Sequence, residues 1–143
     1  MLWGQSLSLY PHSLALVEQA TELFAAIQFL VIGLSHALQP RAWVDFFVWL
    51  RGKGHSGVFV NGFLSLIFGS VIVGFHNVWT GLPMILTIFG WAQILKALMS
   101  FVVPQYGLRS MHRVSHERTR DFVVAGVFFV GMSVLMFYIA LRR

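Results

Sequence analysis

Seven polar side chains that could do chemistry lie in or beside apolar stretches of this sequence. They form two groups, Glu18, Glu22, His76 and Asn77 in the first and His36, Asn61 and Lys96 in the second. Carboxylates and imidazoles bind metal ions and carry protons. An ionisable side chain inside a bilayer is costly and usually faces protein or water. What these groups can do therefore depends on the segments that carry them.

The composition indicates that lipid covers much of this chain. Of its 143 residues, 57% are hydrophobic and only 10% are charged, whereas soluble domains carry about 25% charged residues. There are no cysteines, which excludes a disulfide framework and a cysteine-based metal site. The N-terminal stretch has no basic region ahead of its apolar residues, so we do not expect a cleaved signal peptide.

Four apolar segments predict an all-α integral membrane protein. They cover about residues 20–38, 57–76, 82–103 and 121–141. Each is close to the roughly 20 residues that a helix needs to cross a bilayer, and backbone groups in lipid must be paired within the segment. We expect a four-helix bundle that forms one transmembrane domain over residues 1–143.

The connectors between these segments predict the orientation. Segment 77–81 is short and uncharged, which indicates a tight hairpin on the outer side. The two long connectors hold seven basic residues, namely Arg41, Arg51, Lys53, Arg109, Arg113, Arg118 and Arg120. Only Arg142 and Arg143 lie on the other side. The positive-inside rule then places both long connectors in the cytoplasm and both termini outside.

Aromatic and basic residues of the connectors predict contacts with lipid headgroups. The stretch "RAWVDFFVWL" places its aromatic residues on one helical face, which is typical of an amphipathic helix in the membrane interface. We expect Trp43, Trp49 and Trp79 to act as interfacial anchors. Basic residues of the second connector could hold anionic headgroups; these are Arg109, Arg113, Arg118 and Arg120.

Pro40 and Pro104 end the first and third apolar segments in the same way, because proline cannot continue a helical hydrogen-bond ladder. The chain thus contains two units of helix, proline, basic connector and helix, offset by 64 residues. At this offset Gly62 matches Gly126, but most other positions differ. A parallel two-fold repeat is one interpretation; a coincidence of two hairpins is the one we favour from sequence.

Small and polar residues recur at helical spacing and predict the packing faces, because small side chains let membrane helices approach closely. The second apolar segment carries Asn61, Ser65, Gly69, Ile72 and His76 on one stripe; the third carries Thr87, Gly90, Gln93, Ala97 and Ser100; the fourth carries Gly126, Ser133 and Ala140.

The two polar groups have alternative interpretations. We expect His76 and Glu22 to form a structural contact at the outer face without a metal; the alternative is that they form with Glu18 a cation site or proton relay. Lys96 can extend toward the inner face, which we favour, or pair with Asn61 and the region of His36.

The stretches "GLSHALQPRAW", "NGFLSLIFGSVIVGFHNVW" and "GWAQILKAL" resemble small four-helix bacterial inner-membrane proteins without an assigned function. The resemblance covers about Gly33 to Pro104. It implies a bacterial inner membrane and implies nothing about mechanism.

No catalytic motif is present, so we expect neither an enzyme nor a cofactor. We expect an accessory or scaffold subunit of a homo-oligomer or a larger membrane complex, in contact with the bilayer and with anionic headgroups but not with nucleic acid. The alternative is a protomer of an oligomeric channel or transporter for a small solute, ion or proton, since four short helices need symmetry to enclose a path.

Overall fold

The fold of this protein consists of six α-helices and one short 3₁₀ helix. The computed structural model describes the backbone of residues 3–143 and the side chains of residues 12–143, and this part contains no strand. The helices are α1 (Trp3–Leu38), α2 (Pro40–Gly52), α3 (His55–Phe75), α4 (Met84–Val102), α5 (Pro104–His112) and α6 (Thr119–Arg142), with η1 (His116–Arg118) before α6.

Four of these helices are long and apolar enough to cross a membrane, as the sequence predicts. The candidate spans are His12–Leu38, His55–Phe75, Met84–Val102 and His116–Arg142. The predicted start of the first helix near residue 20 is wrong, because α1 already begins at Trp3. Glu18 and Glu22 therefore lie well inside α1 and not at its start.

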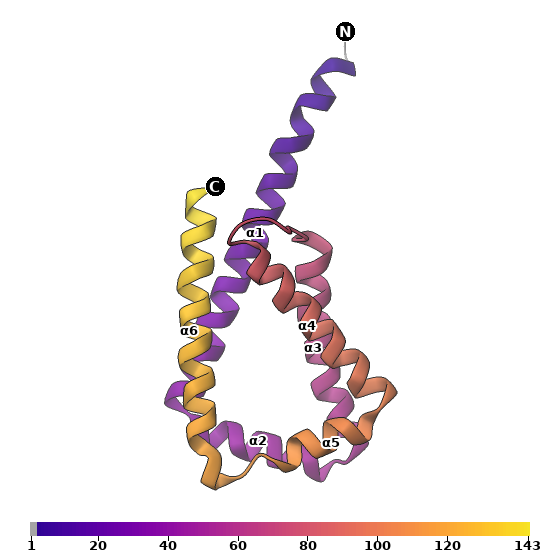
Figure 1. The fold of residues 1–143 in the computed structure, drawn as a ribbon, viewed down its shortest axis with the longest axis vertical. Coiled ribbons are helices and arrows are strands. Elements are labelled where there is room, and N and C mark those ends of the chain that lie inside the picture. Colours follow the sequence, from indigo (N-terminus) through magenta and orange to yellow (C-terminus); the bar gives the residue numbers. More distant parts are fainter. Residues whose placement is uncertain (1–2) are drawn as a thin grey trace.

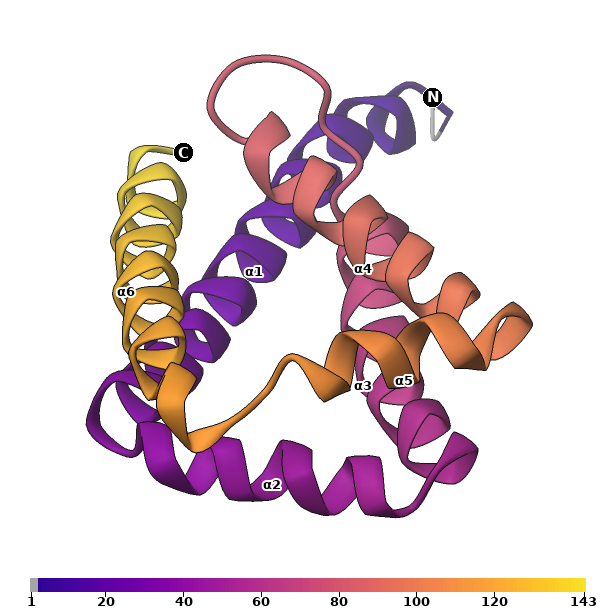
Figure 2. The same cartoon turned by 60° about the horizontal axis from the view of Figure 1, so that its bottom comes forward.

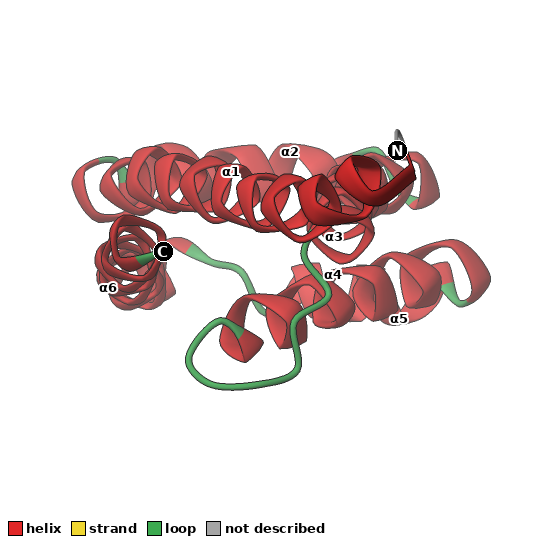
Figure 3. Cartoon of the chain, turned by 90° about the horizontal axis from the view of Figure 1, so that it is seen from above, coloured by secondary structure: helices red, strands yellow, loops and turns green. Residues whose placement is uncertain are grey.

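The helices form two layers and two packed pairs. Figure 3 shows α1, α2 and α3 in one layer and α4, α5 and α6 in the other. Across the layers α1 packs along α6 and α3 packs along α4. The short helices α2 and α5 connect the two pairs at one end of the molecule (Figures 1 and 2). Helices α1–α3 and α4–α6 thus form two three-helix units, and the first helix of each unit packs on the last helix of the other unit.

Contacts between the two units repeat at the 64-residue offset. A Cβ added to Gly126 would lie against Ala37, and a Cβ added to Gly62 would lie against Phe101. Gly62 and Gly126 are 64 residues apart, and so are Ala37 and Phe101. In the same way Gly69 meets the carbonyl of Gly90, and the Ser133 hydroxyl donates a hydrogen bond to the carbonyl of Ala26 at 2.8 Å. These matched contacts favour the two-fold repeat over the coincidence that the sequence favoured.

Most residues of the predicted packing stripes are buried, whereas Asn61 and Gln93 are half-buried. The buried residues include Ser65, Gly69 and Ile72 of α3, Thr87, Gly90, Ala97 and Ser100 of α4, and Gly126, Ser133 and Ala140 of α6. Large apolar side chains such as Leu64, Leu95 and Val124 are exposed. The small residues therefore form the helix contacts, and most of the large residues on the opposite faces are free to meet lipid.

Arg51 links the two short helices, α2 and α5, by hydrogen bonds. Its Nη1 donates hydrogen bonds to the carbonyl oxygens of Met111 and Val114, at 3.3 and 3.2 Å. A basic side chain satisfies the last carbonyls of a helix well, and Arg51 here does so for α5 from the neighbouring α2. This contact fixes the segment after α5, including Arg113.

Candidate functional site

The first polar group, Glu18, Glu22, His76 and Asn77, contains a fully buried contact between α1 and the end of α3. His76 Nε2 lies 3.0 Å from Glu22 Oε1, and both side chains are 0% exposed. Burial of two such groups is costly unless they pair with each other. The predicted contact between His76 and Glu22 is confirmed, and it holds the α1–α6 pair against the α3–α4 pair.

Two further residues complete this cluster. Arg143 donates hydrogen bonds to the Glu22 carboxylate at 2.9 and 3.1 Å and pairs with Glu18 at 2.6 Å. The Thr87 hydroxyl of α4 lies 3.3 Å from His76 Nδ1 and 3.2 Å from the His76 carbonyl. Each of the four long helices therefore contributes to one cluster. The helices α1 and α4 contribute residues of their own, and α3 and α6 contribute the residue that follows each of them.

Arg143 neutralises the acidic side of the cluster. Burial lowers the pKa of Arg143, but the hydrogen bonds and charges of Glu22 and Glu18 outweigh it and hold the pKa above its usual value. The sequence predicts Arg143 at the same end of the helices as Glu18 and Glu22, but its pairing with these two carboxylates was not predicted. The signal was present, because two carboxylates and an arginine at the same face should pair.

Asn77 lies beside this cluster but does not belong to its buried part. Its Oδ1 accepts a hydrogen bond from the indole N–H of Trp79 at 3.0 Å and lies 3.5 Å from that of Trp91, at an exposed position. Asn77 thus orders the hairpin between α3 and α4. Trp79 is 54% exposed, and its role as an interfacial anchor stays a prediction.

A layer of phenylalanine rings separates the two polar groups. Phe29 of α1 packs against Phe68, Phe89 and Phe129, with ring centroids 5.8, 4.9 and 5.8 Å away. Each of the four long helices contributes one ring. Phe29 lies seven residues from Glu22 and seven from His36, which is about 10 Å along the helix in each direction. Phe29 is 3% exposed, so a buried apolar ring lies between the two groups on this face of α1.

The second polar group, His36, Asn61 and Lys96, lines a cavity on the other side of this layer. The cavity has a volume of about 490 Å³ and lies between the two helix pairs. His36, Asn61 and Lys96, the whole group that the sequence singled out, contribute to its lining. Lys96 Nζ lies 3.4 Å from Asn61 Oδ1. The structure therefore shows the pairing of Lys96 with Asn61, the alternative that the sequence analysis did not favour.

His36 is positioned by an aromatic stack at the wall of this cavity. Its Nδ1 lies 2.8 Å from the carbonyl oxygen of Ile32 and can donate to it, and its ring stacks on Trp43 with centroids 3.9 Å apart. The Trp43 indole N–H donates to Ser35 at 2.9 Å. Trp43 is thus tied to α1, whereas Trp49 is 57% exposed and carries Lys53 over its ring.

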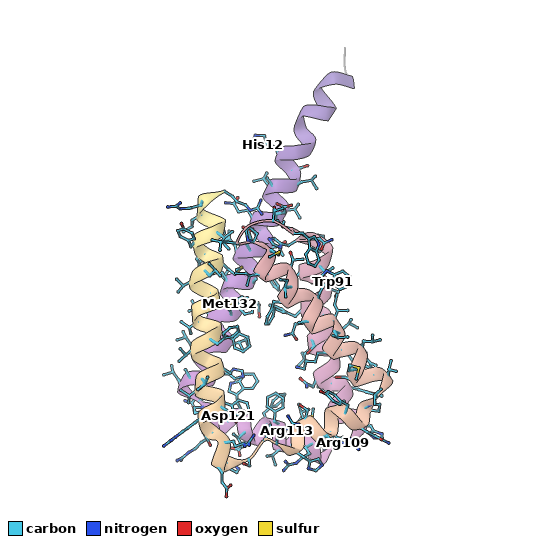
Figure 4. The ribbon with its side chains drawn as sticks, in the orientation of Figure 1. His12, Trp91, Arg109, Arg113, Asp121 and Met132 are labelled. Atoms are coloured by element: carbon cyan, nitrogen blue, oxygen red, sulfur yellow. The ribbon has the colours of Figure 1, made fainter. Side chains whose placement is uncertain are left out.

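The four arginines predicted to bind headgroups fall into three places. Arg113 and Arg118 line the inner cavity. Arg120 lines a separate surface depression together with Arg41 and His116. Arg109 is exposed and is not among the residues that line either one. Figure 4 labels Arg109 and Arg113 in the region of α5 and Asp121 near the start of α6.

A metal centre has little support in the geometry of residues 12–143. Within these residues no three His, Asp or Glu side chains gather as a metal site requires.

No protein-family model matches the chain, and neither a curated protein nor a solved structure matches it.

Proposed function

We propose that this chain is a non-catalytic, membrane-spanning accessory or scaffold subunit. The phenylalanine layer is the observation that carries the proposal. A transport path through this chain would have to connect the Glu22–His76 cluster to the cavity around Lys96, and the rings of all four long helices pack between them. The buried polar groups of the outer cluster bond to one another, so their role is to hold helices together.

The first part of α1 offers a surface for another subunit. The whole of α1 has 36 residues, which correspond to a length of about 54 Å. The hydrocarbon core of a bilayer is only about 30 Å thick. Figure 1 shows α1 extending well past the end of α6 without a neighbouring helix. Leu14 and Leu16 in this part are 58% and 61% exposed. A second copy or a larger membrane complex would cover these side chains.

Cross-linking through α1 tests the accessory role. The chain has no cysteine, so Leu16→Cys provides a unique site for a thiol cross-linker in native membranes. We expect Leu16→Cys to give a specific cross-linked band, to itself or to a co-purifying protein. Val124→Cys, exposed on α6, is the matched control and should give less. A chain that is monomeric, captures no partner and cross-links equally from both positions would contradict the proposal.

An oligomeric channel or transporter protomer is the second candidate. The two-fold repeat favours it, because membrane transporters often place substrate sites at the interface between repeats, and residues of both repeats line the cavity, among them Asn61 of α3 and Lys96 of α4. Solute or proton flux through purified protein in liposomes would support this candidate. We expect no flux above that of empty liposomes, because the phenylalanine layer closes the interior.

We further propose a bacterial inner-membrane location with the basic connectors in the cytoplasm, which cysteine labelling checks. Ser56→Cys and Ser110→Cys lie on the connector side, and Thr80→Cys lies in the opposite hairpin. A membrane-impermeant maleimide should label Thr80→Cys in spheroplasts and the other two only after lysis, because basic connectors stay in the cytoplasm. The opposite pattern would show that the topology is inverted.

A further inference from the structure

We propose that the inner cavity binds a phosphate group, and that an anionic phospholipid is its carrier. This inference does not rest on the accessory role. It concerns the cavity of about 490 Å³ that α2 and α5 close at one end of the molecule.

Lys96 is the central group of the proposed site. It lies six residues before the end of α4, and Asn61, which it contacts, lies six residues after the start of α3. Both are thus about 9 Å from the connector ends of their helices. Within the described residues, Lys96 takes part in no ion pair; its contact with Asn61 uses one of the three N–H donors of an ammonium group. A cation within a membrane span usually pairs with a counter-charge or faces a water-filled cavity.

The other charges of the cavity also favour an anion. Arg113 and Arg118 line it together with Lys96, and Asp121 is the one carboxylate on the same wall. The wall therefore has an excess of positive charge. Neither arginine forms an ion pair within the part of the chain that the structure describes, so both guanidinium groups are available. Guanidinium and ammonium groups that converge from different elements are the usual partners of phosphate.

The remaining lining fits a lipid better than a free ion. Apolar side chains share the wall with the charged ones, among them Phe47, Met111, Phe122 and Phe129. An amphipathic cavity that opens between membrane helices matches a headgroup joined to acyl chains. Its position at the connector end places it toward one end of the candidate membrane spans, where basic clusters attract anionic headgroups. The cavity adjoins a second one of about 300 Å³ through Asn61, Lys96 and Ser110, which provides further room.

Lipid binding to the purified full chain tests the site. Affinities for phosphatidylglycerol and for phosphatidylcholine are compared in mild detergent by native mass spectrometry. We expect wild-type protein to prefer phosphatidylglycerol, and Lys96→Gln to lower that affinity about tenfold, the size expected for losing a charged hydrogen bond. Arg113→Gln combined with Arg118→Gln should act in the same direction, and Lys96→Arg should retain binding.

Arg109→Gln is the matched control, because it removes one exposed basic residue of α5 that is not among the cavity residues. It should change the affinity less than twofold. Competition with inorganic phosphate separates the two sources of the ligand: displacement of lipid at millimolar phosphate would support a small-anion site, and retained lipid would support a phospholipid site. Equal losses in Arg109→Gln and Lys96→Gln, or no binding of either ligand by wild-type protein, would overturn the proposal. Retained melting temperature in Lys96→Gln shows that the loss is local.

Discussion

Replacing Glu22 by leucine is expected to lower the free energy of unfolding in detergent by about 3–5 kcal/mol, the usual cost of breaking a buried ion pair from one side. Glu22 is fully buried and is shared by His76 and Arg143. Leucine would leave the imidazole and part of the guanidinium without their acceptor. The α1–α6 pair would then lose its main polar contact with the end of α3.

Glu18→Leu is the matched control for this effect. Glu18 lies one turn earlier on the same helix and pairs with the same Arg143, but its side chain is 31% exposed. Exposed ion pairs contribute at most about 1 kcal/mol, and Arg143 keeps Glu22 as a partner. Thermal or denaturant unfolding of both variants gives the comparison. Equal losses would show that the buried cluster does not hold the helices together.

Combining Glu22→Leu with His76→Gln isolates the contact between the two residues. His76→Gln alone should cost less than Glu22→Leu, because an amide still donates and accepts one hydrogen bond. In a double-mutant cycle, residues in one hydrogen-bond network deviate from additivity by about 0.5–3 kcal/mol. If the losses in unfolding free energy were additive, Glu22 would stabilise the fold through its hydrogen bonds with Arg143 and not through its contact with His76.

The sequence predicted the elements better than their arrangement. Apolar length alone located the four candidate spans, and the spacing of small residues identified the faces on which Ser65, Gly90 and Ser133 are buried. Both signals are local, since each depends on one helix only. The early start of α1 carried no such signal, because polar residues and glycine interrupt the apolar residues of the stretch before residue 12, "MLWGQSLSLYP", and no N-cap pattern precedes residue 20.

Contacts between distant residues explain what the sequence analysis missed. Arg143 reaches Glu18 across 125 positions of the chain, and nothing in the local pattern states that α6 packs along α1. Lys96 was expected to extend toward the inner face, since that is the default for a lysine in a span. The pairing of α3 with α4 brings Asn61 opposite Lys96, and the cavity provides room for the charge. The packing of α6 on α1 was not predicted, whereas the α3–α4 hairpin was predicted and only the position of Asn61 opposite Lys96 within it was missed.

Gly126→Leu is expected to lower the free energy of unfolding by about 3 kcal/mol or more, at the upper end of the range for an overpacked contact. A Cβ at Gly126 would lie 2.6 Å from the backbone nitrogen of Ala37 and 2.7 Å from the carbonyl oxygen of Gly33. Backbone atoms cannot rotate away, so α6 and α1 would have to separate. Because the Lys96 cavity lies between the helix pairs, its lipid binding should weaken as well.

The internal repeat provides a graded series for this prediction. Gly62, which matches Gly126 at the 64-residue offset, is less crowded: an added Cβ would lie 2.9 Å from Ser100 Cβ and 3.4 and 3.5 Å from ring atoms of Phe101. Gly62→Leu should therefore cost less than Gly126→Leu, because its closest contact is longer and the Phe101 ring can move. Gly131 of α6 and Gly74 of α3 have no heavy atom within 4 Å of an added Cβ, and leucine there should change stability by less than about 0.5 kcal/mol. Unfolding of the four variants in the same detergent measures the order. A loss in Gly131→Leu as large as that in Gly126→Leu would mean that leucine acts on α6 itself and not on its contact with α1.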